Sequence, residues 1–335
     1  MGRSGTTLIE KLLTNHHEVD ILSQPFPLLF ISLKTLFFES IGIKKYYVLN
    51  DDIHDRNYLQ NDFDSFLKNL NINKDFLVKL FEKMQQYSGQ YTKIETLNIN
   101  EKNLSNLSGI YEELLNSFNL KDKQLIGSKE TMCEEFIPYL SDNNFNSIII
   151  LRDPRDVVAS ANYPKGDKHF GDKKPILFIL RTWRKSIEYI KLLKNNQNFY
   201  YIKYEDLVTN PYEILNEITN FLNIEAFKQN HFDNGIYDRD GKLWKANTSF
   251  DTQTSFISTQ SVGGYKNVLS DDEINYIESI CKSEMELMGY ILDTIPNKEI
   301  IKEFRDYGIE ESEHLDKNFS SLNENMEQEI KRYDK

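Results

Sequence analysis

The sequence predicts an α/β fold built around a central parallel sheet. Two short apolar runs, 147–151 and 199–203, have the continuous β-branched or aromatic composition of strands. A helical pattern follows each run, over 154–160 and over 211–222, and both helices begin at a proline. A turn at 2–5 with two glycines also leads into a helix. Repeated strand–turn–helix units are typical of parallel sheets, where ligands bind at the carboxyl ends of the strands.

The other elements follow in order along the chain. Leu8, Ile9, Leu12 and Leu13 share one face of the first helix. The most apolar stretch, 25–38, is interrupted by Lys34 and predicts one or two buried helical turns. Residues 30–125 are predicted to form a mostly helical insertion on a single domain spanning 1–300. Residues 301–335 hold 10 acidic and 6 basic side chains, so we expect a partly ordered helical tail.

Composition limits the class of protein. The 335 residues are 39% hydrophobic and 13% aromatic, which is enough to fill a core. The net charge of −12 argues against a nucleic-acid partner. Two cysteines cannot form a disulfide framework in a chain of this length. No signal peptide or membrane-spanning run is visible, so the expected location is the cytoplasm. Oligomeric state is not predicted.

Charge is nevertheless distributed unevenly. Between Arg152 and Lys203, 12 Lys and Arg face 5 Asp and Glu. We expect this surplus to gather around a site for one small, highly anionic ligand.

The turn before the first helix has the features of a phosphate-binding loop. Gly2 and Gly5 let the backbone approach an anion, and the helix N-terminus favours negative charge. Thr6 and Thr7 add hydroxyl donors, and Arg3 adds a planar fork suited to phosphate or sulfate. The Gly-Lys-Ser/Thr ending of a Walker A motif is absent, which weakens a kinase or GTPase interpretation.

Two further motifs lie at the ends of the predicted strands. Arg152 ends the first strand, and Ser160 follows two helical turns later, so both can reach one phosphate. Tyr204 ends the second strand and offers a flat face to a purine. Asp153 and Asp156 are interpreted as helix-capping residues rather than catalytic acids.

These three motifs, in this order, resemble the sulfotransferases that use 3′-phosphoadenosine 5′-phosphosulfate (PAPS). The resemblance implies that Arg3, Ser4, Gly5, Thr6 and Thr7 hold the 5′-phosphosulfate. It also implies that Arg152 and Ser160 hold the 3′-phosphate, and that Tyr204 lies near the adenine. Looser matches occur at the following segments: Gly127-Ser128-Lys129, Trp244 to Phe250, Ser261 to Lys266, and Met288-Gly289-Tyr290. The resemblance covers residues 1–290 and adds Lys266 to the donor-binding set.

The resemblance implies a P-loop NTPase-like three-layer fold and a transfer that needs no metal. Sulfuryl transfer requires mainly that the attacking and leaving groups are held in line with the sulfur, and that positive side chains lie beside the sulfuryl oxygens. Arg3 and Lys129 are the residues expected to supply that charge. The acceptor is expected to be a hydroxyl or amine of a glycan, lipid, peptide or small molecule.

The general base is not assigned. Protein-tyrosine sulfotransferases, which resemble this chain over 12–19, carry a glutamate base where an ungapped alignment places Gln24. An amide cannot accept a proton at neutral pH. His16, His17, Glu18 and Glu130 are nearby in sequence, but a structural role is favoured for each of them.

Relatives also have a strand before the phosphate loop, and the sequence shows none here. We expect a truncated start, with a neighbouring strand filling the gap as the alternative, because a missing central strand leaves two open edges. Two other functions stay open. One is a nucleotide-dependent kinase, and the other is a degenerate sulfotransferase-like binding protein.

Overall fold

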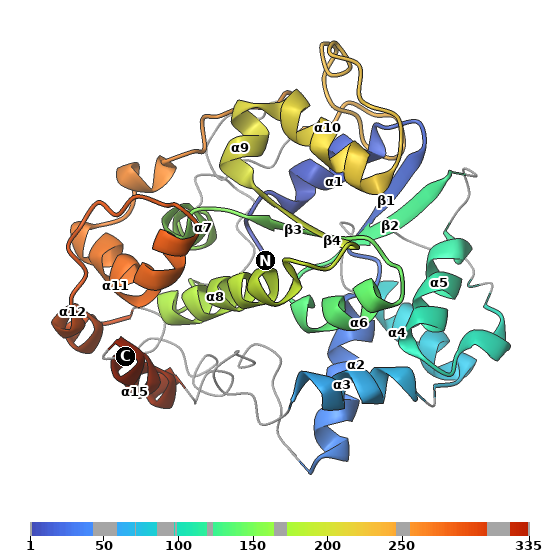
Figure 1. Cartoon of the computed structure of the whole chain (residues 1–335), viewed down its shortest axis with the longest axis horizontal. Helices are drawn as coiled ribbons and strands as arrows, with labels where there is room; N and C mark the ends of the chain where they lie inside the picture. Colours follow the sequence, from blue (N-terminus) through green and yellow to red (C-terminus); the bar gives the residue numbers. More distant parts are fainter. Residues whose placement is uncertain are drawn as a thin grey trace.

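The computed structural model describes residues 2–42, 59–70, 72–85, 97, 99–118, 123–163, 173–245, 255–306 and 322–333. Four short strands lie at its centre (Figure 1). They are β1 (Val19–Ser23), β2 (Leu125–Lys129), β3 (Ser147–Leu151) and β4 (Phe199–Lys203). β1 pairs with β2 in parallel, Val19 opposite Leu125, and β3 pairs with β4 in parallel, Ser147 opposite Phe199.

The expected single central sheet is not seen in the described part of the chain. Each strand pair is a separate two-stranded sheet, and no backbone ladder joins β1–β2 to β3–β4. Within the described residues no strand precedes α1 (Thr6–Thr14), and residues 2–5 form a turn. The parallel pairing and the helices on both sides agree with the predicted α/β class.

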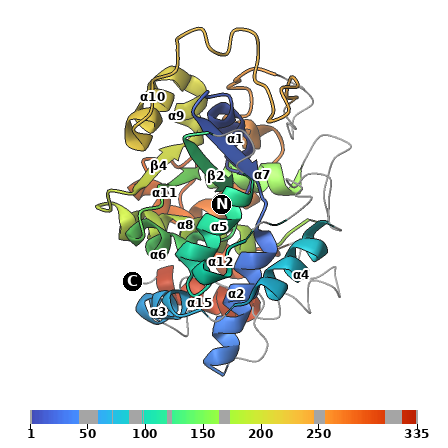
Figure 2. The same ribbon diagram turned by 90° about the vertical axis from the view of Figure 1, so that its right-hand side faces the viewer.

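One layer of helices covers a face that both strand pairs share. It contains α1, α9 (Tyr204–Thr209) and α10 (Pro211–Leu222), which lie above the strands in Figures 1 and 2. Its apolar core joins Leu12 of α1 to Val19 of β1, Ile150 of β3 and Ile202 of β4. This shared core holds the two strand pairs in one layered arrangement although their backbones do not pair.

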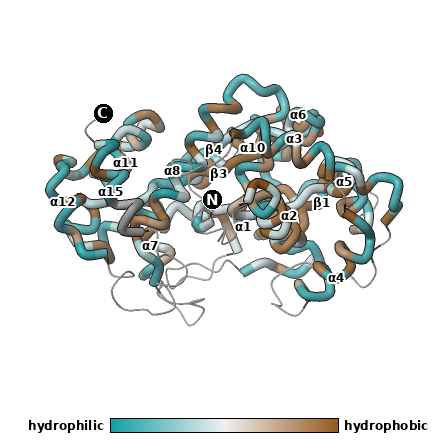
Figure 3. The backbone as a smooth tube through the Cα atoms, turned by 90° about the horizontal axis from the view of Figure 1, so that it is seen from below, coloured by the Kyte–Doolittle hydropathy of each residue, from teal (hydrophilic) through white to brown (hydrophobic). Residues whose placement is uncertain are grey.

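Two further cores lie on the opposite side. The core on β3 is built by α7 (Pro154–Asn162), α8 (Ile176–Leu193), α11 (Asp271–Leu287) and α12 (Lys298–Glu303). The core beside β1 is built by α2 (Pro27–Ser40), α3 (Gln60–Lys68), α4 (Lys74–Gln85), α5 (Leu107–Ser117) and α6 (Ile137–Asp142). Short 3₁₀ turns occur at η2 (Glu101–Asn103), η3 (Glu134–Phe136) and η4 (Gly264–Asn267). Figure 3 shows hydrophobic and hydrophilic residues alternating along many of these helices, as amphipathic packing requires.

Several sequence expectations can be compared with these elements. β3, β4 and α10 have the predicted bounds, and α7 begins at Pro154 as expected. The apolar stretch 25–38 forms a longer helix than expected, 14 residues from Pro27, because Lys34 does not interrupt it. The Lys34 ammonium is buried against the Glu135 carboxylate, which neutralises it inside the core. β1 and β2 were not predicted, since Asp20 and Gly127 break their apolar runs.

In the described part of residues 152–203, several of the basic side chains are used in ion pairs rather than gathered around one site. Arg155 pairs with Glu278 at 2.6 Å, Arg184 pairs with Glu329 at 2.6 Å, and Lys185 pairs with Glu135 at 2.8 Å. These cations neutralise carboxylates that are themselves buried, because an unpaired charge in the core is costly. Arg152 contacts the phosphate loop, and the charge of Lys174 interacts with Arg3 of that loop.

The C-terminal residues include a helix, α15 (Leu322–Tyr333), which lies against α8 and α12 (Figure 1). Arg332 of α15 pairs with Glu284 of α11 at 3.0 Å. Residues 307–321, 334 and 335 of the expected tail lie outside the described residues. Within the described residues, no helix has the length and apolar character needed to cross a membrane.

Candidate active site

The turn that opens α1 exposes backbone donors at the ends of the central strands. Arg3 and Gly5 have φ angles of 64° and 92°, so the chain turns sharply into the helix. Gly5 is the N-cap of α1 and has no side chain to satisfy the first helical N–H groups. Thr6 and Thr7 form the first turn. These unsatisfied N–H groups and the helix dipole favour an anion at this end of α1.

Ser4 adds a donor that the protein itself leaves unused. Its side chain is fully buried, and its Oγ atom has no hydrogen-bond partner among the described residues. A buried hydroxyl without a partner is uncommon in folded proteins. Ser4 is therefore available to bond a group placed in the loop.

Gly5 is also required by close packing. A Cβ atom built on Gly5 would lie 2.4 Å from Cδ2 of Tyr204. The aromatic ring therefore lies directly against the loop backbone, which places the start of α9 beside the start of α1. This contact brings two of the three predicted motifs together.

Arg152 connects the third motif to the other two. Its guanidinium carbon lies 4.7 Å from the centroid of the Tyr204 ring. Nη1 donates to the backbone oxygen of Arg3 at 3.4 Å, and Nη2 donates to the backbone oxygen of Ser261 at 2.5 Å. Nη2 of Arg152 also forms an ion pair with the Asp156 carboxylate at 3.7 Å. Nε is buried and has no partner within the described part of the chain.

Ser160 lies at the same place, as the spacing from Arg152 predicted. Its Oγ accepts from Nε of Arg3 at 3.1 Å, although 157 positions separate the two residues. Desolvation and, to a smaller extent, the positive charge of Arg152 lower the pKa of Arg3. Desolvation and the charge of Arg3 also lower the pKa of Lys174. Cations that disfavour one another in this way create a region suited to a multivalent anion.

Buried acids hold the backbone of this site in place. Asp153 is the N-cap of α7, accepting from the Arg155 N–H at 2.9 Å, as predicted. Asp156 instead bonds two distant N–H groups, those of Gly263 and Tyr265, at 2.8 and 2.9 Å. Glu205 accepts the Asp153 N–H at 2.8 Å. These contacts fix the strand ends and the 261–265 segment relative to one another.

Sequence reasoning missed two residues that contact the site. Ser261 bonds Tyr204 through its hydroxyl at 2.6 Å and accepts from Arg152 through its backbone oxygen. Trp183 of α8 donates its indole N–H to the Arg152 backbone oxygen at 2.8 Å. Only the loose match over 261–266 hinted at Ser261, and no sequence signal marked Trp183.

Lys129 lies at the end of β2, on the other strand pair. Its ammonium donates to Oε1 of Gln24 at 3.4 Å and lies 3.7 Å from Oε2 of Glu10 on α1. Burial lowers the pKa of Lys129, and Glu10 opposes that shift. α1 is thus the element that connects Lys129 to the phosphate loop.

The remaining predicted site residue, Lys266, lies in η4. The Lys266 ammonium pairs with Asp293 at 3.1 Å and is well exposed. It follows directly after the Gly263–Tyr265 backbone that Asp156 holds. Of the looser matches, Tyr290 donates to Glu205 at 3.2 Å, whereas 246–250 lie outside the described residues.

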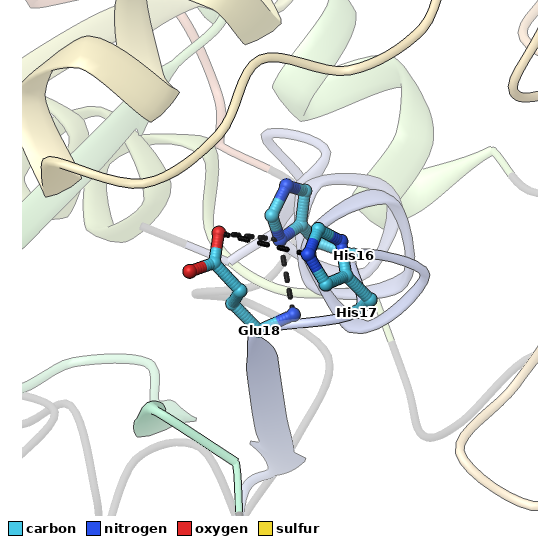
Figure 4. A group of neighbouring side chains, drawn as sticks. All are labelled: His16, His17 and Glu18. Carbon is cyan, nitrogen blue, oxygen red and sulfur yellow. Dashed lines mark hydrogen bonds and ion pairs between the residues drawn. The ribbon is translucent and has the colours of Figure 1, made fainter.

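The residues considered as bases or metal ligands occupy other places. His16, His17 and Glu18 have ligand atoms within 4.8 Å of one another (Figure 4). They follow the carboxyl end of α1, about 13 Å along the helix from Gly5. His16 has both ring nitrogens engaged, Nδ1 by the Glu18 N–H at 3.2 Å and Nε2 by the Glu225 oxygen at 2.9 Å. Because both His16 nitrogens are already hydrogen-bonded, these three residues are poorly suited to bind a metal ion.

Glu130 directly follows Lys129, the last residue of β2. Oε1 accepts the Phe26 N–H at 2.9 Å, and Oε2 is buried with no partner among the described residues. Burial raises the pKa of Glu130 to about 8. It serves as an anchor for the start of α2.

Comparison with known proteins identifies the family. The model of the sulfotransferase domain matches residues 1–289. No curated protein matches the chain.

Among solved structures, the chain is similar to a sulfotransferase domain from the curacin biosynthetic pathway, with 19% identity and a TM-score of 0.47 over 87% of this chain and 95% of that one. A sulfotransferase domain from the Synechococcus PCC 7002 olefin synthase has 18% identity and a TM-score of 0.44 over 80% and 86%. A mouse sulfotransferase complexed with PAP has 15% identity and a TM-score of 0.36 over 57% and 74%. Since the family model spans most of the chain and includes every motif of the site, this protein belongs to the sulfotransferase domain family.

Proposed function

We propose that the protein transfers a sulfuryl group from PAPS to a hydroxyl or amine of an acceptor. The observation that carries this proposal is the convergence of Arg3, Arg152, Ser160 and Tyr204 on the loop that opens α1. Three segments far apart in the sequence thereby form one positively charged site beside a flat aromatic ring.

The residues at this site fit the parts of PAPS. Arg152 and Ser160 would hold the 3′-phosphate, and Tyr204 would lie against the adenine. The loop N–H groups, Ser4 and the hydroxyls of Thr6 and Thr7 would hold the 5′-phosphosulfate. Two buried donors support this fit, because Oγ of Ser4 and Nε of Arg152 have no partner within the described residues. Lys266 stays in the proposed donor-binding set.

PAPS would supply an activated sulfuryl group bonded to its 5′-phosphate oxygen. The bond from sulfur to that oxygen would break as the acceptor oxygen or nitrogen bonds to sulfur, PAP would leave with the bonding electrons, and the acceptor proton would pass to solvent. Arg3 and Lys129 would stabilise negative charge on the oxygens. Contacts to the 3′-phosphate and adenosine orient the donor, so their binding energy serves the transfer. Glycans, lipids, peptides and small molecules are all acceptor classes for this chemistry.

Calorimetric titration separates this proposal from a kinase function. We expect the protein to bind 3′-phosphoadenosine 5′-phosphate (PAP) without Mg²⁺, and to bind it more tightly than ATP with Mg²⁺. Tighter binding of ATP with Mg²⁺, with no response to PAP, would overturn the proposal.

A binding protein without catalytic activity is the second candidate, and the neutral Gln24 favours it. Transfer of labelled sulfate from PAPS to a panel of alcohols, phenols, amines and glycans distinguishes the two. If the parent protein transfers sulfate to any acceptor and Arg152→Ala does not, the enzyme function is supported. PAP binding without transfer to any acceptor supports the binding protein.

A further inference from the structure

A buried carboxylate of α1 faces the end of β2. Glu10 follows five residues after Gly5, and its side chain is almost fully buried. Its Oε1 accepts from the Lys11 ammonium at 2.7 Å. Its Oε2 has no hydrogen bond within the described residues and lies 3.7 Å from the Lys129 ammonium. The buried Glu10 carboxylate therefore has two cations beside it, Lys11 and Lys129, which offset the cost of burying its charge.

Lys129 is held from two sides by this arrangement. On one side Gln24 accepts from the ammonium at 3.4 Å, and the Gln24 N–H bonds the Lys129 backbone oxygen at 2.8 Å. On the other side lies Glu10. An ammonium has three N–H groups. One N–H bonds Gln24 and the charge faces Glu10, so an N–H remains that can point at a sulfuryl oxygen.

The charges around Lys129 come from α1 and from the residue that follows β2. Glu10 and Lys11 lie on α1, and Glu130 directly follows Lys129. Gln24, on the β1 side, carries no charge. Glu130, whose Oε1 accepts the Phe26 N–H, also raises the pKa of Lys129, but less than Glu10 does. Glu10 is therefore the carboxylate in ion-pair contact with the Lys129 ammonium in the described part of the chain.

We propose that Glu10 is a positioning residue, which holds Lys129 protonated and aimed at the sulfuryl group of PAPS. This inference rests on the proposed function, since it assigns a role within the same site. It also gives a reason for a buried carboxylate on α1, because Gln24, on the other side of Lys129, carries no charge.

The consequence is a pH-dependent donor affinity. Burial, the largest influence, lowers the pKa of Lys129, whereas the Glu10 carboxylate raises it. A neutral Lys129 would lose its attraction for the phosphosulfate, so PAPS affinity should decline at alkaline pH. Removing the Glu10 charge should move that decline to lower pH, because a nearby opposite charge favours the protonated ammonium.

The experiment measures the dissociation constant of PAPS by calorimetry from pH 6 to 10, without an acceptor. Glu10→Gln should move the alkaline decline downward. Lys11→Met should move it upward, because it removes a nearby positive charge that lowers the pKa of Lys129. Gln24→Glu should also move it upward, by placing a second carboxylate on the other side of the ammonium. The double variant Glu10→Gln with Gln24→Glu should return the decline toward its original pH.

Each result has a defined meaning. A merely structural role for Glu10 would weaken PAPS binding equally at every pH, and that result overturns the inference. If Glu10→Gln does not fold, an unmoved decline in Gln24→Glu and Lys11→Met overturns it instead. If the parent protein binds PAPS with a decline that Glu10→Gln leaves in place, the inference fails and the proposed function stands. If the parent binds no PAPS at any pH, the proposed function itself fails.

Discussion

The guanidinium carbon of Arg152 lies 4.7 Å from the ring centroid of Tyr204. The Tyr204 hydroxyl bonds Ser261 at 2.6 Å, and its ring edge lies against Gly5. This one contact joins the carboxyl ends of β3 and β4 to the phosphate loop. A cation over an aromatic face is stabilising, and here it also brings a charged donor and a flat stacking surface to the same site.

Arg152→Ala should selectively weaken ligands that carry a 3′-phosphate. A charge-assisted hydrogen bond contributes about 1.5–3 kcal/mol, so PAP affinity should fall by about 10- to 150-fold. Affinity for adenosine 5′-phosphate, which lacks the 3′-phosphate, should change little. Calorimetry with both ligands checks this, and an equal loss for both would refute the assigned contact.

Gly5→Ala should destabilise the loop and weaken nucleotide binding. The new Cβ would meet the Tyr204 ring at 2.4 Å, and the φ of 92° is unfavourable for alanine. We expect a loss of about 1–3 kcal/mol in the free energy of unfolding.

Gly241→Ala is the matched control for this substitution. Gly241 has a φ of 77° with no atom within 4 Å of the added Cβ, so it carries backbone strain without a clash. Urea unfolding should show the smaller loss for Gly241→Ala, with PAP affinity retained. Equal losses in stability would show that the Tyr204 contact is unimportant.

Glu130 should make the stability of the protein depend on pH. Burial raises its pKa from 4.5 to about 8 in the folded state. Between these values the folded protein keeps a proton that the unfolded chain releases, so the stability contributed by Glu130 falls as pH rises. The slope is at most about 1.4 kcal/mol per pH unit for one group.

Glu130→Gln should flatten the stability profile between pH 4.5 and 8, since an amide does not titrate. Urea unfolding at several pH values measures this, with the exposed Glu213→Gln as control. A profile for Glu130→Gln that parallels the parent would contradict the assignment.

The C-terminal helix should depend on one buried carboxylate. Glu329 is 2% exposed and bonds Arg184, which is fully buried, at 2.6 Å and Arg332 at 3.0 Å. Glu329→Ala would leave the Arg184 charge partly uncompensated, at a cost of about 3–5 kcal/mol. Glu327→Ala, an exposed position on the same helix, should cost little. Urea unfolding and limited proteolysis of α15 compare the two, and similar behaviour would refute the role of the ion pair.

Local patterns in the sequence determined part of this protein. The runs at 147–151 and 199–203 form strands with the predicted bounds, because β-branched and aromatic residues between turn signals specify a strand locally. The prolines that begin α7 and α10 mark helix starts for an equally local reason. The order of the motifs was sufficient to identify the sulfotransferase family.

Tertiary structure decided the features that depend on distant contacts. β1 and β2 pair although about 100 residues separate them, and neither contains a strong strand pattern. The basic surplus after Arg152 enters ion pairs with carboxylates such as Glu278 and Glu329, because a buried charge requires a partner. The contact of Lys129 with Glu10 is of the same kind. The energy of such contacts depends on separation in space and on burial, which residue spacing along the chain does not determine.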